Sequence, residues 1–287
     1  MTSSSATWRS CRAASALLAL AALCRPAAPA FANHTPYGVF PEDQQVFHEL
    51  IADPRHIQLG VSYYRLAGGD NADAALGHSW GMARWYLKDD KWVLQWNVEG
   101  MAYSRFILGG GVNEFQTVDF IANLPLYVRH GRFSARGMAF HQSSHLGDDY
   151  IRRTGDQGVR YSDEGVNVVL SYDAAYWARV YAGGTYLLHT VPFPQRRSGQ
   201  AGFELTSREL RWSEKYLLHL FVAEDVQTHE NVRWNVNSRA VAGVQVGFKG
   251  VPRSMRIYGG YFTGHSPFGQ FYAQKEHYAD LGISLLF

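Results

Sequence analysis

The chain has 287 residues, with 27 basic and 25 acidic side chains and 18% charged residues overall. This near balance provides no basic patch, so no nucleic-acid partner is expected. Beyond residue 32 the sequence contains no run of eighteen apolar residues, which excludes transmembrane helices. Two classes remain open: a soluble secreted β-protein and a membrane β-barrel.

The N-terminus is typical of a secretory signal peptide. Two arginines precede a short apolar run at 13–23, and Ala-Phe-Ala at 30–32 provides a cleavage site. We therefore predict a signal peptide over residues 1–32. Both cysteines of the chain fall within it, so the exported chain is expected to lack thiols.

Residues 33–56 are expected to form an N-terminal periplasmic segment with a short helix. Pro41 and the two acids that follow it suit a helix start. Val46, Phe47 and Leu50 then recur at helical spacing until Asp53-Pro54 ends the pattern. We place this helix as a cap on the periplasmic side.

From residue 57 to residue 287 the hydrophobic period is two, which predicts about twelve strands. Short links such as 88–91 and 130–131 alternate with long ones such as 67–78 and 146–164. Tight periplasmic turns and long external loops that connect an even number of strands are typical of a transmembrane antiparallel β-barrel. The fold class is therefore all-β, and the expected location is the outer membrane of a Gram-negative bacterium. A soluble sandwich is the alternative.

Aromatic residues and the last strand agree with this prediction. Ten aromatic residues beside the short turns suit an interfacial girdle: Trp85, Tyr86, Trp92, Tyr127, Tyr172, Tyr176, Trp177, Trp212, Tyr216 and Tyr258. The final strand, 278–287, ends on Phe287. It resembles the targeting end of bacterial outer-membrane barrels, which implies the barrel-assembly machinery as a partner.

The predicted strand 132–144 carries the candidate chemistry. An arginine facing lipid near the midplane costs roughly 2–4 kcal/mol, so Arg136 should face the lumen. Side chains alternate along a strand, so His141 and Ser143 should then face outward. Strand direction places them at the outer-leaflet interface, where the ester bonds of membrane lipids lie. Ala135, Gly137 and Ala139 below them leave room for an acyl chain or for a second barrel in a homodimer.

The tripeptide His141-Gln142-Ser143 resembles the His-x-Ser motif of outer-membrane phospholipase A, and a similar motif occurs in lipid A deacylases. The resemblance implies that Ser143 is the nucleophile, that His141 is its base, and that an Asn or Glu on a neighbouring strand orients the imidazole. The longer string 141–150 resembles an uncharacterised family of bacterial outer-membrane proteins, domain of unknown function 1207. In this chain Ser144 and His145 replace the Asn and Gly that follow the phospholipase serine.

Two members of the site remain open. Glu164 is expected on the same face as the lipid-facing valines of the next predicted strand, so we prefer it as the orienting group. Asn167 is the reserve, although the same phase turns it inward. His145 flanks Ser143 at the same spacing as His141 and is the alternative base.

Asp148 and Asp149 offer oxygen ligands for Ca²⁺, or are simply a solvated pair in an external loop. Inward charges such as Glu99, Asp119 and Arg179 would line a pore or form a closed network. Two functions follow from these alternatives. One is a serine esterase acting on phospholipid or lipopolysaccharide, and the other is a non-enzymatic barrel, either a narrow pore or a structural protein.

Overall fold

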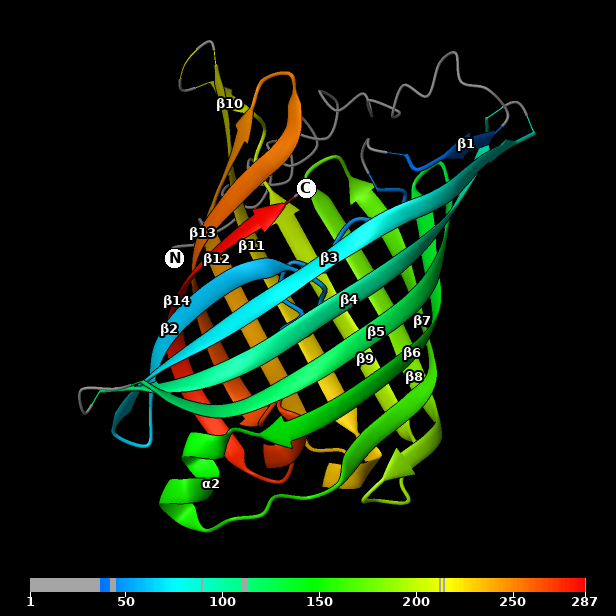
Figure 1. Cartoon of the computed structure of the whole chain (residues 1–287). Coiled ribbons are helices and arrows are strands. Elements are labelled where there is room, and N and C mark those ends of the chain that lie inside the picture. Colours follow the sequence, from blue (N-terminus) through cyan, green and yellow to red (C-terminus); the bar gives the residue numbers. More distant parts are fainter. Residues whose placement is uncertain are drawn as a thin grey trace, which may run out of the picture.

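A computed structural model describes residues 37–41, 45–88, 90–109, 113–211, 213 and 215–286. The predicted signal peptide, Trp212 and Phe287 lie outside the described residues. Twelve antiparallel strands close into a barrel, in which β3 pairs with both β2 and β4 (Figure 1). These strands are β2 (Leu59–Leu66), β3 (Gly69–Leu87), β4 (Trp92–Leu108), β5 (Glu114–His130), β6 (Phe133–Leu146), β7 (Tyr161–Ala175), β8 (Ala178–Val191), β9 (Arg197–Thr206), β11 (Tyr216–His229), β12 (Val236–Phe248), β13 (Val251–His265) and β14 (Lys275–Leu286).

Smaller elements lie at the two ends of the barrel. At the end with the short turns, β1 (Tyr37–Val39) pairs with β3, and β10 (Leu210–Arg211) pairs with β11. At the other end, Figure 1 shows α2 (Asp148–Thr154) outside the barrel wall. The 3₁₀ turns η1 (Glu230–Val232) and η2 (Gly269–Phe271) belong to long links. No helix in the described part of the chain is long and apolar enough to cross a membrane.

The predicted twelve-stranded barrel is confirmed, but the predicted loop over 67–78 is wrong. Only Ala67 and Gly68 form the turn, and β3 starts at Gly69 rather than Ser79. The polar residues that suggested a loop point into the lumen: Asp73 accepts a 2.6 Å hydrogen bond from the Tyr64 hydroxyl and pairs with Arg105 at 3.0 Å. A polar interior makes such a strand resemble a loop in sequence.

The distribution of residues is that of a membrane barrel. Large apolar side chains such as Leu124, Leu170 and Leu281 are exposed on the outside, whereas the buried interior side chains are largely charged or amide. Several predicted girdle aromatics, including Trp85, Trp92 and Trp177, are exposed near the short turns. For Tyr127 and Tyr258 the girdle prediction is wrong: Tyr127 is buried against the inner segment described next, and Tyr258 lines a lumenal cavity.

The predicted N-terminal helix is not present in residues 45–58, which form turns and irregular chain; residues 42–44 lie outside the described part. The physical reason is that wall arginines take carbonyls that a helix would need for its own ladder. Arg179 donates to the backbone oxygens of His48 and Glu49, both at 3.0 Å, and Arg129 donates to that of Val46 at 3.5 Å.

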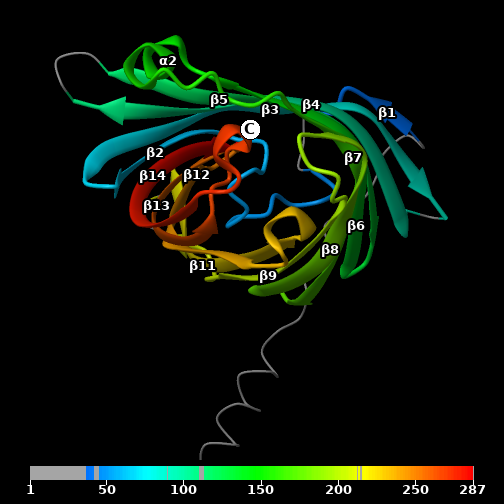
Figure 2. The same ribbon diagram turned by 90° about the horizontal axis from the view of Figure 1, so that it is seen from below.

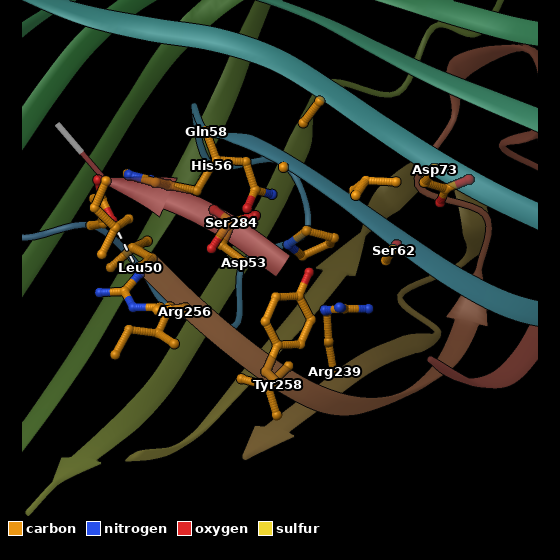
Figure 3. A pocket seen from close by; sticks show the side chains of 18 of the residues that line it. Leu50, Asp53, His56, Gln58, Ser62, Asp73, Arg239, Arg256, Tyr258 and Ser284 are labelled. Atoms are coloured by element: carbon orange, nitrogen blue, oxygen red, sulfur yellow. Dashed lines mark hydrogen bonds and ion pairs between the residues drawn. The ribbon is translucent and has the colours of Figure 1, made fainter. Parts of the chain in front are cut away.

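Residues 45–58, which we name the plug, lie inside the barrel instead of capping it (Figure 2). Phe47 stacks on the inward ring of Tyr127, with 5.9 Å between ring centroids. Asp53 accepts hydrogen bonds from Gln200 and Gln227 of the wall, at 3.1 and 3.2 Å. On the other side of the plug, a small cavity of about 40 Å³ separates it from β12, β13 and β14, with Arg239 and Tyr258 on the wall side (Figure 3).

Ion pairs and an inward-folded loop fill the remaining lumen. Buried pairs join Arg105 to Glu276 at 2.7 Å, Arg179 to Glu204 at 3.0 Å and Arg239 to Asp280 at 2.7 Å. In the link between β13 and β14, the ring of Phe268 stacks on that of Tyr103 at 4.5 Å, and the Arg105 guanidinium lies 4.4 Å from the Phe268 centroid. The inward charges therefore form a closed network rather than the lining of an open pore.

We predict that Arg179→Ala releases the plug. The change leaves Glu204 buried without its partner and removes two hydrogen bonds from plug carbonyls, a loss of roughly 3–5 kcal/mol in the free energy of unfolding. Limited proteolysis should then cleave the chain within 45–58, and the unfolding midpoint should fall. The matched control is Arg132→Ala, an exposed turn arginine that donates to Ala174. Equal protease resistance in both variants would show that Arg179 does not hold the plug.

Candidate functional site

The structure confirms the predicted orientation of β6. Ser134, Arg136, Gln142 and Ser144 are buried in the lumen, whereas His141 points outward and is exposed. Arg136 retains only 5% of its accessible surface. Because side chains alternate along a strand, this inward guanidinium fixes the outward face of every odd-numbered residue in β6.

The outward face of β6 brings His141 beside Glu164 of β7. The two residues are directly opposed in the strand register, and Nδ1 of His141 lies 3.2 Å from Oε1 of Glu164. Both side chains are about half exposed, at 49% and 51%. A carboxylate at Nδ1 favours the tautomer with its proton there, which leaves Nε2 unprotonated and able to act as a base.

Ser143 lies one outward position above His141, opposite Ser162 of β7 and Phe120 of β5. Alternate residues of a strand are about 6.7 Å apart, so the imidazole has to lean along the strand to reach the hydroxyl. Within the described part of the chain the structure records no hydrogen bond to the Ser143 side chain, and its partly exposed hydroxyl remains available. Hydrogen bonds between a catalytic serine and its histidine are often long in structures without substrate.

The surroundings of the pair are those of a lipid-facing surface. Ala135, Gly137 and Ala139 form a strip of small residues, and a side chain built at Gly137 would meet nothing within 4 Å. Exposed apolar residues border the strip on both neighbouring strands, including Leu124 of β5 and Val166 of β7. The His141–Ser143 pair thus lies above an apolar surface with space for hydrocarbon.

Asn167, the alternative orienting group, and His145, the alternative base, differ in whether they share a face with His141 and Ser143. Asn167 is buried in the lumen, where it accepts a 3.1 Å hydrogen bond from Arg136 and donates to Thr185 at 2.9 Å. It does not share a face with Ser143. His145 does share that face, with its ring 6.1 Å from that of Phe120, and no carboxylate is recorded beside it among the described residues.

Asp148 and Asp149 begin α2, and Asp149 is already engaged. It accepts a 3.2 Å hydrogen bond from the Phe115 amide and forms an ion pair with Arg152. These two contacts, the amide first, lower the pKa of Asp149. The described residues contain no cluster of three potential ligands of the His, Cys, Asp or Glu type. The calcium assignment of these two acids therefore remains a prediction.

A polar network lies directly beneath the pair, and of its members the sequence indicates only the inward charge of Asp119. Ser144 donates to Asp119 of β5, which also forms a 3.0 Å ion pair with Arg55 of the plug. The backbone amides of Gly269 and Gln270 donate to Asp119 and Ser144, both at 3.0 Å. Ser144 and Asp119 are 25 residues apart, and the other partners lie more than 60 residues apart, so no local pattern signals the network. It fixes the inner side of the β6 segment that carries His141 and Ser143.

Comparisons with known proteins support the fold and the family. A family model described as "Protein of unknown function (DUF1207)" matches residues 20–287. The chain belongs to this family. No curated protein sequence matches it. Among solved structures, this family member resembles the outer-membrane phospholipase A of Escherichia coli, with a TM-score of 0.52 and 10% identity over 82% of this chain and 93% of that one.

Two further structures are similar at low identity. The dimer of the Salmonella typhi outer-membrane phospholipase with bound calcium has a TM-score of 0.50 and 11% identity, over 89% of this chain and 94% of that one. The KdgM porin has a TM-score of 0.41 and 7% identity over 80% of this chain and 99% of that one. At these identities the likeness to the two phospholipase structures shows the fold, and this fold is that of outer-membrane proteins.

We predict that the outward face of β6 tolerates apolar but not charged residues. Ala139→Arg would place a guanidinium in lipid near mid-strand and should cost roughly 2–4 kcal/mol in the free energy of unfolding in lipid vesicles. Ala139→Leu, the matched control at the same position, should leave stability unchanged within about 0.5 kcal/mol. Equal stability of the two variants would contradict the assigned orientation of the strand.

Proposed function

We propose that this barrel is a serine esterase that hydrolyses acyl esters of phospholipid or lipopolysaccharide at the outer leaflet. The observation that supports it best is the 3.2 Å contact between His141 and Glu164 on the lipid-facing surface, one position from Ser143. An acid–imidazole pair and a serine on the same strand face supply the three groups that an activated serine nucleophile needs, once the imidazole leans toward the hydroxyl. Exposed apolar side chains around it suit the acyl chains of the substrate.

In this proposal each residue has one role. Ser143 attacks the ester carbonyl, Nε2 of His141 takes the hydroxyl proton, and the same imidazole later returns a proton to the leaving alcohol. Glu164 holds the imidazole and stabilises its charged form. Water then attacks the acyl-enzyme and releases the fatty acid. The side chain of Ser144 points into the lumen and donates to Asp119, so it does not serve as an oxyanion donor.

The closed lumen disfavours a narrow pore as the alternative. In the described residues, the plug, the ion pairs and the loop before β14 occupy much of the barrel interior and leave separate cavities between them. A non-enzymatic structural barrel remains the competing function. It predicts that Ser143 is chemically inert.

The remaining proposals concern location and partners. We propose export by the signal peptide 1–32, insertion into the outer membrane of a Gram-negative bacterium, and recognition of β14 by the barrel-assembly machinery. A homodimer through the small-residue strip, together with Ca²⁺ held near Asp148, follows the pattern of the calcium-bound phospholipase dimer. Activity measured with Ca²⁺ and with a chelator, at several protein concentrations, tests both.

We predict that Ser143→Ala abolishes release of fatty acid from phospholipid or lipopolysaccharide vesicles, by at least about a thousandfold, because the nucleophile is lost. The barrel should remain folded, since none of the described residues hydrogen-bonds to this hydroxyl. A fluorophosphonate probe should label the wild type and not the variant. Ser162→Ala, the neighbouring outward serine on β7, is the matched control and should retain both activity and labelling. Undiminished hydrolysis by Ser143→Ala would end the proposal.

A second prediction separates the two orienting groups. Glu164→Gln should lower kcat by at least about tenfold, because the amide no longer stabilises the imidazolium. Asn167→Ala should leave kcat within about twofold, since Asn167 lies on the other side of the strand. The measurement is steady-state hydrolysis with both variants checked for folding. The reverse pattern would assign the role to Asn167.

A further inference from the structure

The lumen contains a second, larger cavity that the esterase proposal does not use. It has a volume of about 190 Å³ and lies between the plug and the inner faces of β5 to β9. Phe193 and Gln195 from the link between β8 and β9, together with Asn231 from η1, also line it. Both links are at the long-loop end of the barrel, so the cavity faces the side that the wiring assigns to the exterior.

Arg136 distinguishes this cavity from the rest of the interior. The lumenal arginines Arg105, Arg179 and Arg239 each pair with a buried carboxylate. Arg136 is 5% exposed, yet in the described part of the chain it has no carboxylate within 4.0 Å; its one recorded hydrogen bond goes to the amide oxygen of Asn167. Glu99 and Asp163 line the same cavity and are buried, but neither forms an ion pair with Arg136 in the described residues. A buried guanidinium without an ion pair is unfavourable, and an anion bound in the cavity would supply one.

Unpartnered polar atoms converge on the same space. Nε of Arg136, Oδ1 of Asn123, Oδ1 of Asp163 and Nδ1 of His56 are buried without a hydrogen-bond partner, and all four residues line the cavity. Such groups normally find a partner in protein, water or ligand. They provide a positively charged donor, two acceptors that suit ligand hydroxyl groups, and an imidazole nitrogen that can donate or accept. About six waters would fill the volume, but they would not neutralise the guanidinium.

We propose that this cavity binds a small organic anion. Its carboxylate or phosphate group would lie on the Arg136 guanidinium, and its hydroxyl groups on amides such as Asn123 and Gln142. The volume suits a molecule about the size of a monosaccharide. The mixed donors and acceptors favour a hydroxylated ligand over a purely apolar one. This binding is independent of the chemistry at Ser143.

Titration calorimetry on the full-length folded protein in detergent tests the proposal. Gluconate is the anionic probe, and glucose is its uncharged counterpart of similar size. We expect gluconate to bind with one site per barrel and glucose to bind at least tenfold more weakly. Inorganic phosphate distinguishes the two anion types: competition with gluconate assigns a general oxyanion site, whereas gluconate binding without competition assigns a carboxylate site.

Two variants and a control locate the binding. Arg136→Gln retains a donor for Asn167 and should weaken gluconate at least tenfold. Leu187→Trp, which fills the cavity from β8 without touching the charge, should do the same if Arg136→Gln fails to fold. Arg132→Gln removes an exposed arginine from the turn before β6 and should bind as the wild type does. Equal binding of glucose, unchanged binding by Arg136→Gln or by Leu187→Trp, or no binding of either anion at millimolar concentration would overturn the proposal.

Discussion

The alternation of side chains along β6 is the constraint on which the rest of the structure depends. A strand in a closed barrel has one face in lipid and one in a polar interior, and shifting it by one residue exchanges the two. With Arg136 inside, His141 and Ser143 have to face the membrane. The same alternation presents Gln142 and Ser144 to the lumen, so each residue of the tripeptide motif has an environment opposite to that of its neighbour.

The two faces of this strand are supported by different interactions. Outside, the pair formed by His141 and Glu164 depends on the register between β6 and β7. Inside, Ser144 and Asp119 tie the same segment to the plug through Arg55 and to the loop before β14 through Gly269. The proposed catalytic pair on the lipid-facing surface is thus supported by a polar network on the lumenal side of the same strand. Such support is what precise positioning of a site requires.

Much of this arrangement could be predicted because barrel strands follow a simple local rule. Strand number, the inward Arg136 and the outward Glu164 all follow from period two and the cost of charge in lipid. The predicted start of β3 is too late because Asn71 and Asp73 face the polar lumen, and polar residues at the start of a strand resemble a loop in sequence. The spacing of Val46, Phe47 and Leu50 predicts a helix where the structure has the plug. Their carbonyls are instead captured by arginines far along the chain, and a local pattern carries no information about such partners.

The position of the plug has a consequence for assembly. It directly precedes β2, and β2 completes the cylinder by pairing with β14, the strand farthest from it along the chain. Once β2 and β14 have paired, wall strands surround residues 45–58. Folding of this barrel therefore has to place residues 45–58 inside the space that these strands enclose. Complete folding of this barrel then includes correct packing of its own N-terminal portion. A chain that closed without the plug inside would leave Arg129 and Arg179 without the backbone carbonyls that the plug offers them.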